Sequence, residues 1–381
     1  MKEALSAARL RISAAHRVVV KIGTRVLASD TGRPAARRIN EIVRGVAELK
    51  KSGREVIIVT SGAVGTGLDA LGRKTRPGTV PELQMAAAVG QARLMSYYEK
   101  LFSQQKLKVG QVLLTYDDLN NRTRHLNARN TMMALVRNGI IPIVNENDVV
   151  AVDELAVGDN DVLAALVCVL IEADVLVLLS TVNGLYASGK DGKRERISYL
   201  PRVTREALGA AKGKGGMLST GGMSSKLRWA QTAVSAGALA VIADGRAPAV
   251  LHSIFSGADV GTVIGSAAAT GRVKQSRKKW IAFFHRARGV IVVDEGARGA
   301  VEKRGKSLLP IGIRQVRGNF KAGSFVAIEA LDGRIIARGL ASYSSEQLTK
   351  IKGKKSCEIA AILGRKDYDE AVHRDNMVLA E

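Results

Sequence analysis

Short runs of apolar residues alternate with longer amphipathic segments along the first two thirds of the chain. The runs contain almost no polar position, which is typical of strands buried on both faces, and the longer segments repeat their apolar residues at the period of a helix. The predicted strands are 17–22, 55–60, 109–114, 140–144, 174–179 and 238–243, and the predicted helices are 34–52, 83–101, 123–137, 161–171 and 223–236. This alternation predicts an α/β fold, built on a mainly parallel sheet with helices on both faces.

The pattern changes after residue 265. Residues 266–279 are rich in Ala, Gly, Ser, Lys and Arg, as in a linker, and shorter elements follow them. The predicted strands there are 290–293, 313–316, 324–328 and 335–340, and the predicted helices are 297–304, 346–351 and 357–363, the second opened by a capping box of Ser344 and Gln347. We therefore expect a lead-in helix at 1–16, an α/β domain at 17–265, a linker at 266–279, a small β-rich domain at 280–363 and a C-terminal tail at 364–381.

Composition adds one unusual feature, an excess of basic residues. Lys and Arg number 58 and Asp and Glu number 35, which gives a formal net charge of +23 that is spread over both parts of the chain. Such an excess attracts anions, including phosphorylated ligands and nucleic acid, but it does not identify a partner.

The sequence argues against membrane, secreted and metal-bound classes. Its apolar runs fall short of the roughly 20 residues that span a bilayer, and residues 1–16 lack the apolar region of a signal peptide. The two cysteines, Cys168 and Cys357, lie far apart, and the five histidines lack the spacing of metal ligands. We expect a cytoplasmic protein without a disulfide framework or a metal site of its own.

Ligands bind to parallel α/β sheets beyond the carboxyl ends of the strands, which makes the segments after the predicted strands candidate site residues. These segments, with two polar helix starts, are Gly23-Thr24, Ser61-Gly62, Thr115, Asn145–Asp148, Ser180-Thr181, Asp159–Asp161 and Thr220–Lys226. The stretch 144–161 is the richest in short amide and carboxylate side chains. Such side chains hold an amine or fix a lysine with little loss of side-chain entropy, although the same residues also serve ordinary turns and helix N-caps.

Three segments, Lys21–Thr24, Ser61–Gly67 and Thr220–Lys226, contain glycine where a predicted helix opens. Exposed N–H groups and the helix dipole make such segments anion sites. None of them matches a P-loop or a dinucleotide fingerprint. Gly305-Lys306-Ser307 lacks the first Walker glycine, and His373-Arg374-Asp375 resembles a protein-kinase catalytic loop without its other motifs, so we interpret both as chance matches.

Lys21 and Lys226 are candidate phosphate ligands. Lys21 ends a predicted buried strand, where its charge needs an anion or a carboxylate as a partner. Lys226 lies in the first turn of a predicted helix, where a positive charge opposes the helix dipole. A bound polyphosphate would satisfy both side chains, and the alternative is that both stems extend to solvent.

Motifs of one known family run along nearly the whole chain. They are Val20–Thr24, Val59–Ala63, Leu126–Arg129, Val144–Asp148, Val157–Asp161, Gly184–Tyr186, Thr220–Met223, Val292–Ala297 and Ser307–Pro310. On these residues the sequence resembles, from about Val18 to Met377, the glutamate 5-kinases of the amino acid kinase family. The resemblance implies a three-layer αβα sandwich followed by a PUA domain, which is an RNA-binding fold in other proteins.

The resemblance also implies the reaction. The γ-phosphoryl group of ATP is transferred to the side-chain carboxylate of L-glutamate, which gives L-glutamyl 5-phosphate in the first step of proline biosynthesis. Proline is implied as a feedback inhibitor in the glutamate site, a dimer or tetramer as the assembly, and a separate glutamyl-phosphate reductase as the next enzyme. Because the acceptor is already a carboxylate, positioning and charge neutralisation by lysines, helix N-termini and Mg²⁺ suffice, and no general base is needed.

Individual residues take their roles from the same resemblance. The positions that hold glutamate are matched by Ser61, Asn145, Asp148 and Asn160. Lys21 and Lys226 match the two lysines that grip the phosphates, and Asp161 matches the carboxylate that orients these lysines. The nucleotide-binding positions are matched by Lys21, Gly23, Ser180, Thr181, Thr220, Gly221, Gly222, Met223, Ser224, Ser225 and Lys226.

Two positions depart from the family pattern. Thr181 stands where an aspartate is usual in the nucleotide segment, and Ala156 stands where a basic residue is common. These departures leave open the affinity for the nucleotide and the charge of the substrate loop.

Two alternative functions remain open at this point. The first is a relative that acts on N-acetylglutamate, carbamate or a nucleotide, against which a PUA domain and the pairing of 145–148 with 159–161 argue. The second is an RNA-binding protein with a weakened kinase. Against it, the basic residues of the C-terminal module are dispersed and little interleaved with aromatic residues.

Overall fold

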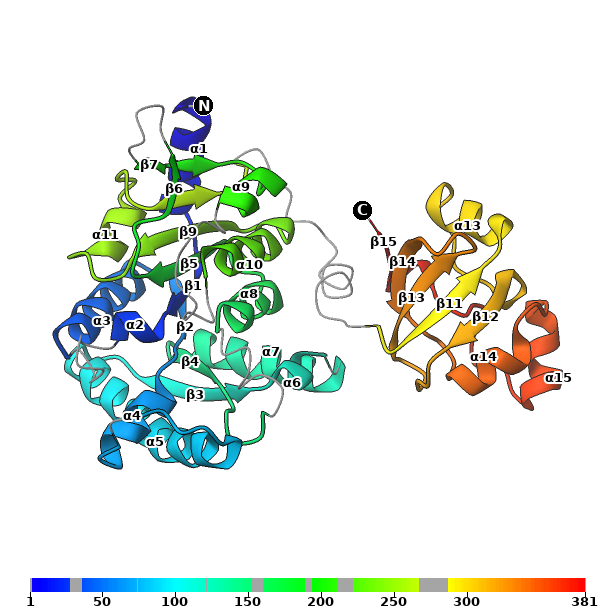
Figure 1. Cartoon of the computed structure of the whole chain (residues 1–381), viewed down its shortest axis with the longest axis horizontal. Helices are drawn as coiled ribbons and strands as arrows, with labels where there is room; N and C mark the ends of the chain where they lie inside the picture. The colour runs from blue at the N-terminus through cyan, green and yellow to red at the C-terminus, as the bar shows by residue number, and fades with distance from the viewer. Residues whose placement is uncertain are drawn as a thin grey trace. The chain divides into compact units, whose positions relative to one another are not determined.

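The computed structural model describes residues 2–27, 36–73, 75–120, 122–151, 160–188, 194–210, 222–266 and 287–380. The chain divides into two compact units, Met1–Arg272 and Val273–Glu381, each with its own sheet (Figure 1). None of the described helices is long and apolar enough to cross a membrane. The ends of the linker at 266–279 stay a prediction, because most of that segment lies outside the described residues.

The first unit follows the predicted alternation of strands and helices. In chain order its elements are α1 (Lys2–Ser13), β1 (Arg17–Ile22), α2 (Thr24–Leu27), α3 (Ala36–Lys51), β2 (Glu55–Val59), α4 (Ala63–Ala70), α5 (Val80–Gln104), β3 (Val109–Leu114), α6 (Tyr116–Asn120), α7 (Arg122–Arg137), β4 (Ile141–Glu146), α8 (Asn160–Leu170), β5 (Val175–Ser180), β6 (Leu185–Ser188), β7 (Arg194–Ile197), β8 (Tyr199–Leu200), α9 (Arg205–Ala210), α10 (Met223–Ser235), β9 (Leu239–Asp244), α11 (Val250–Phe255) and β10 (Thr262–Ile264). The strands and helices predicted for this part are present, with ends that differ by a few residues.

Eight strands form one sheet in the order β3-β4-β2-β1-β5-β9-β10-β8. The neighbours from β3 to β9 pair in parallel, and β10 runs antiparallel to β9. Helices α3 and α11 cover one face of this sheet, and α8 and α10 cover the other (Figure 1). The mainly parallel αβα sandwich expected from the sequence is thereby confirmed.

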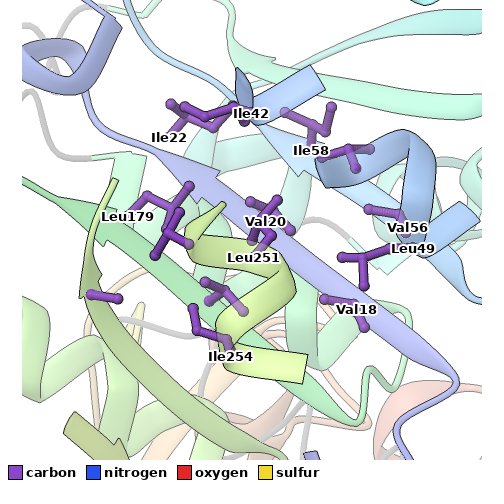
Figure 2. Packing of buried hydrophobic residues seen from close by; sticks show 14 of the residues in the cluster. Val18, Val20, Ile22, Ile42, Leu49, Val56, Ile58, Leu179, Leu251 and Ile254 are labelled. Atoms are coloured by element: carbon purple, nitrogen blue, oxygen red, sulfur yellow. The ribbon is translucent and has the colours of Figure 1, made fainter. Parts of the chain in front are cut away.

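The central strand β1 is buried on both faces. Its alternate residues Val18, Val20 and Ile22 pack in one apolar cluster with Leu251 and Ile254 of α11 (Figure 2). This packing leaves the two faces of the sheet closed to ligands, so that binding residues must gather at the edge where the parallel strands end.

Helix α8 explains how polar residues come to lie inside this unit. Ten of its eleven residues are buried, as expected of a helix that is apolar nearly all round. The first two, Asn160 and Asp161, are polar and lie within the buried set. A buried amide and a buried carboxylate need partners, and these partners define the candidate site.

Helix α4 was not predicted, because its sequence was interpreted through its glycines. Gly62 precedes the helix with a φ of 102°, a left-handed conformation that glycine adopts without strain. Gly67 lies so close to α5 that a Cβ atom there would stand 1.7 Å from the backbone oxygen of Ala86. Gly67 therefore allows α4 and α5 to pack closely against each other.

The second unit is a small β-rich domain, as predicted. Its elements are β11 (Gly289–Val293), α13 (Glu295–Glu302), η1 (Pro310–Gly312), β12 (Ile313–Arg317), β13 (Phe325–Ala330), β14 (Ile335–Leu340), α14 (Ser345–Ile351), η2 (Ser356–Glu358), α15 (Ile359–Leu363), η3 (Arg374–Asn376) and β15 (Met377–Leu379). The sheet order is β12-β11-β13-β14-β15. The predicted capping box of Ser344 and Gln347 opens α14.

Residues 364–381 were expected to form a tail outside this domain. The structure instead pairs β15 with β14 in antiparallel fashion and joins Leu308 to Val372 through an isolated bridge. Ala371, Val372 and Met377 are buried in the core of the unit. The domain thus extends beyond residue 363, and a strand of three residues within a polar segment was too short to give a periodic signal.

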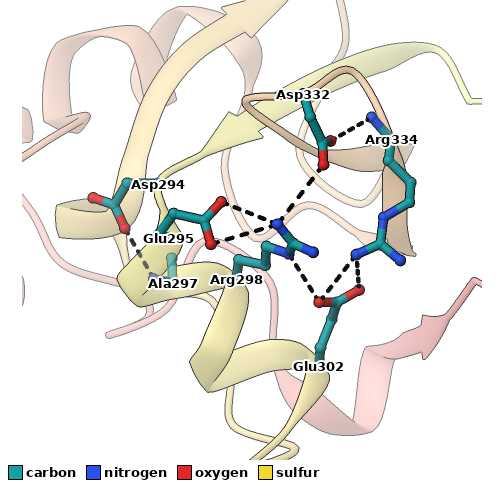
Figure 3. Close-up of polar contacts among 7 residues, drawn as sticks. All are labelled: Asp294, Glu295, Ala297, Arg298, Glu302, Asp332 and Arg334. Atoms are coloured by element: carbon teal, nitrogen blue, oxygen red, sulfur yellow. Dashed lines mark hydrogen bonds and ion pairs between the residues drawn. The ribbon is translucent and has the colours of Figure 1, made fainter.

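An ion-pair cluster fastens helix α13 to the turn between β13 and β14 (Figure 3). Arg298 pairs with Glu295, Glu302 and Asp332, and Arg334 pairs with Glu302 as well. Because most of these side chains are exposed to solvent, each pair contributes modestly to stability.

Candidate functional site

Two lysines share one buried carboxylate at the carboxyl edge of the large sheet. Lys21 Nζ, near the end of β1, lies 2.6 Å from Asp161 Oδ1, and Lys226 Nζ, in the first part of α10, donates to Asp161 Oδ2 at 2.7 Å. The side chains of Lys21 and Lys226 are 6% and 11% exposed, and that of Asp161 is fully buried. The lysine stems therefore do not extend to solvent, which answers the alternative that the sequence left open.

Electrostatics keeps this carboxylate ionised. Burial by itself would raise the pKa of Asp161, but the charges and hydrogen bonds of Lys21 and Lys226 outweigh it and lower the pKa to about 2. Two ammonium groups against one carboxylate leave a net positive charge at a place of low exposure. Such a place attracts an anion that carries several negative oxygens, as a polyphosphate does.

A chain of side-chain amides adjoins the charged centre. Asn160, next to Asp161 in α8, donates from Nδ2 to the backbone oxygen of Thr60 and, at 2.9 Å, to Asn145 Oδ1. Asn145 in turn donates from Nδ2 to Gln91 Oε1 at 2.8 Å. The structure thus brings together the end of β2, the end of β4 and the start of α8, three segments that the sequence analysis had singled out.

Ser61 and Asp148 follow strands β2 and β4, which pair in parallel. Ser61 is buried and adjoins Thr60, and Asp148 is half-buried in the turn after β4. Because parallel strands end at the same edge of the sheet, both residues lie at the edge that carries Lys21. Their carboxylate and hydroxyl groups suit an amino acid ligand, whose ammonium donates and whose carboxylates accept.

The segments assigned to the nucleotide lie on the other side of β1. Gly23 is hydrogen-bonded to the end of β5, whose last residue is Ser180. The backbone oxygen of Thr181 accepts a hydrogen bond from Arg246 Nη2 at 2.6 Å, and Arg246 is itself paired with Asp244 at the end of β9. An ion-paired arginine therefore anchors the turn that contains Thr181.

The start of α10 closes this side of the site. Gly222 is the N-cap residue of α10, and Met223, Ser224, Ser225 and Lys226 form its first turn. An α-helix N-terminus is a favourable place for an anion, because its first N–H groups have no partner within the helix. Thr220, Gly221, Asp159 and Ala156, which the sequence analysis named, lie outside the described residues.

Helix α5 supports the site, and the sequence analysis had assigned it no role. Gln91 accepts a hydrogen bond from Asn145, and Tyr98, two turns further along the helix, lies with its hydroxyl 2.9 Å from Thr60 Oγ1. Burial raises the pKa of Tyr98 to about 12 against the opposing effect of the Thr60 hydrogen bond, so the phenol stays neutral. Gln91 and Tyr98 are seven positions apart, so they lie on the same face of α5. This spacing is the sequence signal that could have indicated a shared role.

Two family models match the chain, one for each unit. The model of the amino acid kinase family matches residues 16–244, and the model of the PUA domain matches residues 289–363. The first match includes Lys21, Asp161 and Lys226.

Curated relatives match over almost their whole length. The glutamate 5-kinase of Moorella thermoacetica is 46% identical over 374 residues, which are 97% of this chain and 98% of the relative. That of Citrifermentans bemidjiense is 47% identical over 95% of this chain and 97% of its own length. That of Chromohalobacter salexigens is 43% identical over 100% of both chains. On these similarities the chain belongs to the amino acid kinase family, among the glutamate 5-kinases, and its C-terminal unit is a PUA domain.

Proposed function

We propose that this chain is a kinase that uses ATP to phosphorylate the side-chain carboxylate of L-glutamate, the first step of proline biosynthesis. The observation that carries the proposal is the carboxylate of Asp161, which holds two buried lysines while its neighbour Asn160 opens a chain of amides. A cationic centre for phosphates thus adjoins polar groups suited to an amino acid. The name shared by the relatives supports glutamate as the acceptor.

In this proposal the lysines stabilise the transferred group. The bond between the γ-phosphorus and the oxygen that bridges to ADP breaks as a bond forms to a side-chain oxygen of glutamate. Lys21 and Lys226 face the negative charge on the phosphoryl oxygens, and Asp161 keeps both ammonium groups in place. The attacking oxygen carries no proton at neutral pH, so no general base takes part.

The remaining predicted residues divide between the two substrates. Ser61, Asn145, Asp148 and Asn160 bind glutamate, with the carboxylate of Asp148 as the partner of its α-ammonium group. Gly23, Ser180, Thr181 and residues 220–226 bind ATP. For Thr181 the Arg246 hydrogen bond to its backbone oxygen supports a role of the turn as a whole rather than of the hydroxyl.

Mg²⁺ enters this proposal as the partner of the nucleotide phosphates. The described residues contain no group of three or more His, Cys, Asp and Glu side chains that could hold a metal ion, and Asp161 directs both oxygens to lysines. No step of the proposal therefore passes through a protein-bound ion.

Regulation, assembly and compartment complete the proposal. Proline competes with glutamate for the amide-rich subsite, the chain forms a dimer or tetramer, and a separate reductase takes up the labile acyl phosphate. A reducing cytoplasm suits the two cysteines, Cys168 and Cys357, which lie far apart in the sequence.

The test is ADP release from Mg-ATP with L-glutamate, with N-acetylglutamate and without acceptor, each with and without proline. We expect turnover that depends on glutamate and is suppressed by millimolar proline. Turnover with N-acetylglutamate alone would contradict the choice of acceptor, and glutamate turnover indifferent to proline would contradict the proposed regulation. The variants Lys21→Ala and Lys108→Ala give a matched pair, because Lys108 is exposed between α5 and β3.

A second candidate function, RNA binding by the C-terminal unit, is favoured by one pocket. This pocket of about 660 Å³ lies beside α13 and the segment before β12. Its lining includes Arg304, Lys306 and Arg374, with Asp294 and Glu370 as opposing charges. The chance matches Gly305-Lys306-Ser307 and His373-Arg374-Asp375 thus meet at one place, where the Arg374 N–H donates to Ser307 Oγ.

RNA binding at this pocket has a clear measurement. Affinity for a single-stranded RNA that falls steeply as salt rises, and that weakens in Arg304→Ala, would support this function. Equal binding of wild type and variant would exclude the pocket as the RNA site.

A further inference from the structure

We propose that Gln91 of α5 binds the amino acid substrate directly, by donating a hydrogen bond from Nε2 to one of its carboxylate oxygens. This inference rests on the proposed function and adds a residue to the glutamate subsite. Neither the motifs of the family resemblance nor the segments at the carboxyl ends of the strands include Gln91.

The hydrogen bonds fix which end of each amide faces which neighbour. The backbone oxygen of Thr60 can only accept, so the atom of Asn160 that contacts it is the nitrogen, Nδ2. The same nitrogen donates to Asn145, which must therefore present its oxygen to Asn160 and its nitrogen to Gln91. Gln91 accordingly presents Oε1 to Asn145, and its Nε2 group remains a donor.

This donor is enclosed in the protein. Gln91 Nε2 is buried and makes no hydrogen bond with any residue in the part of the chain that the structure describes. A buried donor without a partner costs free energy, and in native proteins such groups most often belong to a ligand or a water molecule. Because Gln91 presents its nitrogen, Nε2, at this place, the missing partner must be a hydrogen-bond acceptor.

The chemistry of the substrate supplies that acceptor. Glutamate carries one ammonium group, which only donates, and two carboxylates, which only accept. Asn160 and Asn145 connect Gln91 to the side of Asp161 that lies away from the nucleotide segments of β5 and α10. Among the groups of the two substrates, a glutamate carboxylate is therefore the acceptor that fits Gln91.

The packing of α5 holds Gln91 rigidly at this place. Its neighbour Gly90 lies against α4, where a Cβ atom would stand 1.8 Å from the backbone oxygen of Ala63. Ala63 follows Ser61, a predicted glutamate ligand, by two residues. The close contact between α4 and α5 therefore places Gln91 near Ser61 and the proposed substrate-binding segment.

The substitution Gln91→Glu separates substrate binding from mere support. The new carboxylate still accepts from Asn145, so a supporting role is retained, but the donor to the substrate is replaced by a negative oxygen. We expect the KM for L-glutamate to rise about 10- to 100-fold at pH 8, with the KM for ATP changed less than about twofold. Burial beside the substrate carboxylate would raise the pKa of the new side chain, and its protonated form donates again, so the KM for glutamate should fall as the pH is lowered toward that pKa.

Two further variants complete the test. Gln91→Met keeps the size of the side chain without either polar group, and we expect a raised KM for glutamate that does not depend on pH in this range. Gln104→Glu makes the same change at an exposed position about 20 Å further along α5 and should leave both KM values unchanged. Thermal unfolding of each variant shows that the protein measured is folded.

The outcomes distinguish this inference from the proposed function. If the wild type neither turns over nor binds L-glutamate in calorimetry, the proposed function fails and the role of Gln91 fails with it. If the wild type is active and folded Gln91→Glu keeps the wild-type KM for glutamate at every pH, the proposed function stands and Nε2 serves a buried water instead. If unfolding rather than KM changes in both Gln91 variants, the residue only supports Asn145.

Discussion

Gly90 of α5 lies directly against Ala63 of α4, so closely that a Cβ atom on Gly90 would stand 1.8 Å from the backbone oxygen of Ala63. The contact is repeated one turn away, where Gly67 of α4 faces the backbone oxygen of Ala86 at 1.7 Å from an ideal Cβ position. Each helix thus has two small residues four positions apart at this contact, Ala63 and Gly67 in α4 and Ala86 and Gly90 in α5. Larger side chains at these positions would keep the two backbones further apart. Because Ser61 precedes α4 and Gln91 follows Gly90, this contact positions two residues of the proposed glutamate subsite.

The substitution Gly90→Ala should separate the two helices. The added methyl group meets backbone atoms, which cannot rotate away, so we expect a loss of about 2–3 kcal/mol in the free energy of unfolding and a raised KM for glutamate. Urea denaturation measures the first effect. The control is Gly65→Ala, which lies in α4 with no atom within 4 Å of the new Cβ. It should be neutral or stabilising by up to about 1 kcal/mol, and equal losses in both variants would contradict the packing argument.

Removal of the shared carboxylate should destabilise the fold. Asp161→Asn removes the negative charge that the buried Lys21 and Lys226 share, and we expect a loss of about 3–5 kcal/mol of stability. The triple variant Lys21→Met/Asp161→Asn/Lys226→Met removes all three charges and should recover much of that loss. Thermal unfolding at low salt gives the comparison, and a triple variant as unstable as Asp161→Asn would argue against charge repulsion as the cause.

Substitution of Lys21 should affect turnover more than binding. In the proposed mechanism its ammonium group meets charge that grows on the phosphoryl oxygens in the transition state. We expect Lys21→Ala to lower kcat by about 10²- to 10³-fold, with a smaller effect on the KM for either substrate. Steady-state kinetics with Lys108→Ala as the exposed control measures this split. A normal kcat in folded Lys21→Ala would remove the residue from the catalytic centre.

Substitution of Asp148 should have the opposite kinetic signature. Its half-buried carboxylate follows β4 and is the proposed partner of the glutamate ammonium group. Asp148→Ala should raise the KM for glutamate about 10- to 100-fold, the range expected for loss of one charged hydrogen bond, with kcat nearly unchanged. An unchanged KM in the variant would remove Asp148 from the site.

His125 should make the stability of the protein sensitive to mild acid. It lies in α7, where burial and, to a smaller extent, the charge of Arg129 lower its pKa to about 4, against a hydrogen bond with the Leu119 backbone. Between pH 6.5 and 4 the unfolded chain therefore binds a proton that the folded chain does not, so stability falls as the pH is lowered. We expect His125→Gln to retain about 1–3 kcal/mol more of its neutral-pH stability at pH 4.5 than the wild type retains. Equal pH slopes in denaturant unfolding would refute this.

Much of the fold was readable from local pattern. The strands 17–22 and 174–179 were found almost to the residue, because buried parallel strands are almost entirely apolar and are flanked by glycine and polar turns. The tail was misjudged for the converse reason. The strand Met377–Leu379 is short and follows a polar segment, so only its pairing with β14 reveals it.

The sequence by itself determined that Lys21, Asn145 and Asp161 stand at the ends of elements, because strand ends and helix starts have local signatures in apolar period, glycine and capping residues. The family resemblance also implied that Asp161 orients both lysines, and in the structure its carboxylate contacts both of them. Only the tertiary structure decided that Asn145 reaches Gln91. Contacts between residues far apart in the chain depend on the order of the strands and on how closely helices pack. The close packing of α5 against α4 at Gly90 is such a contact, and the hydrophobic pattern within either helix does not predict it.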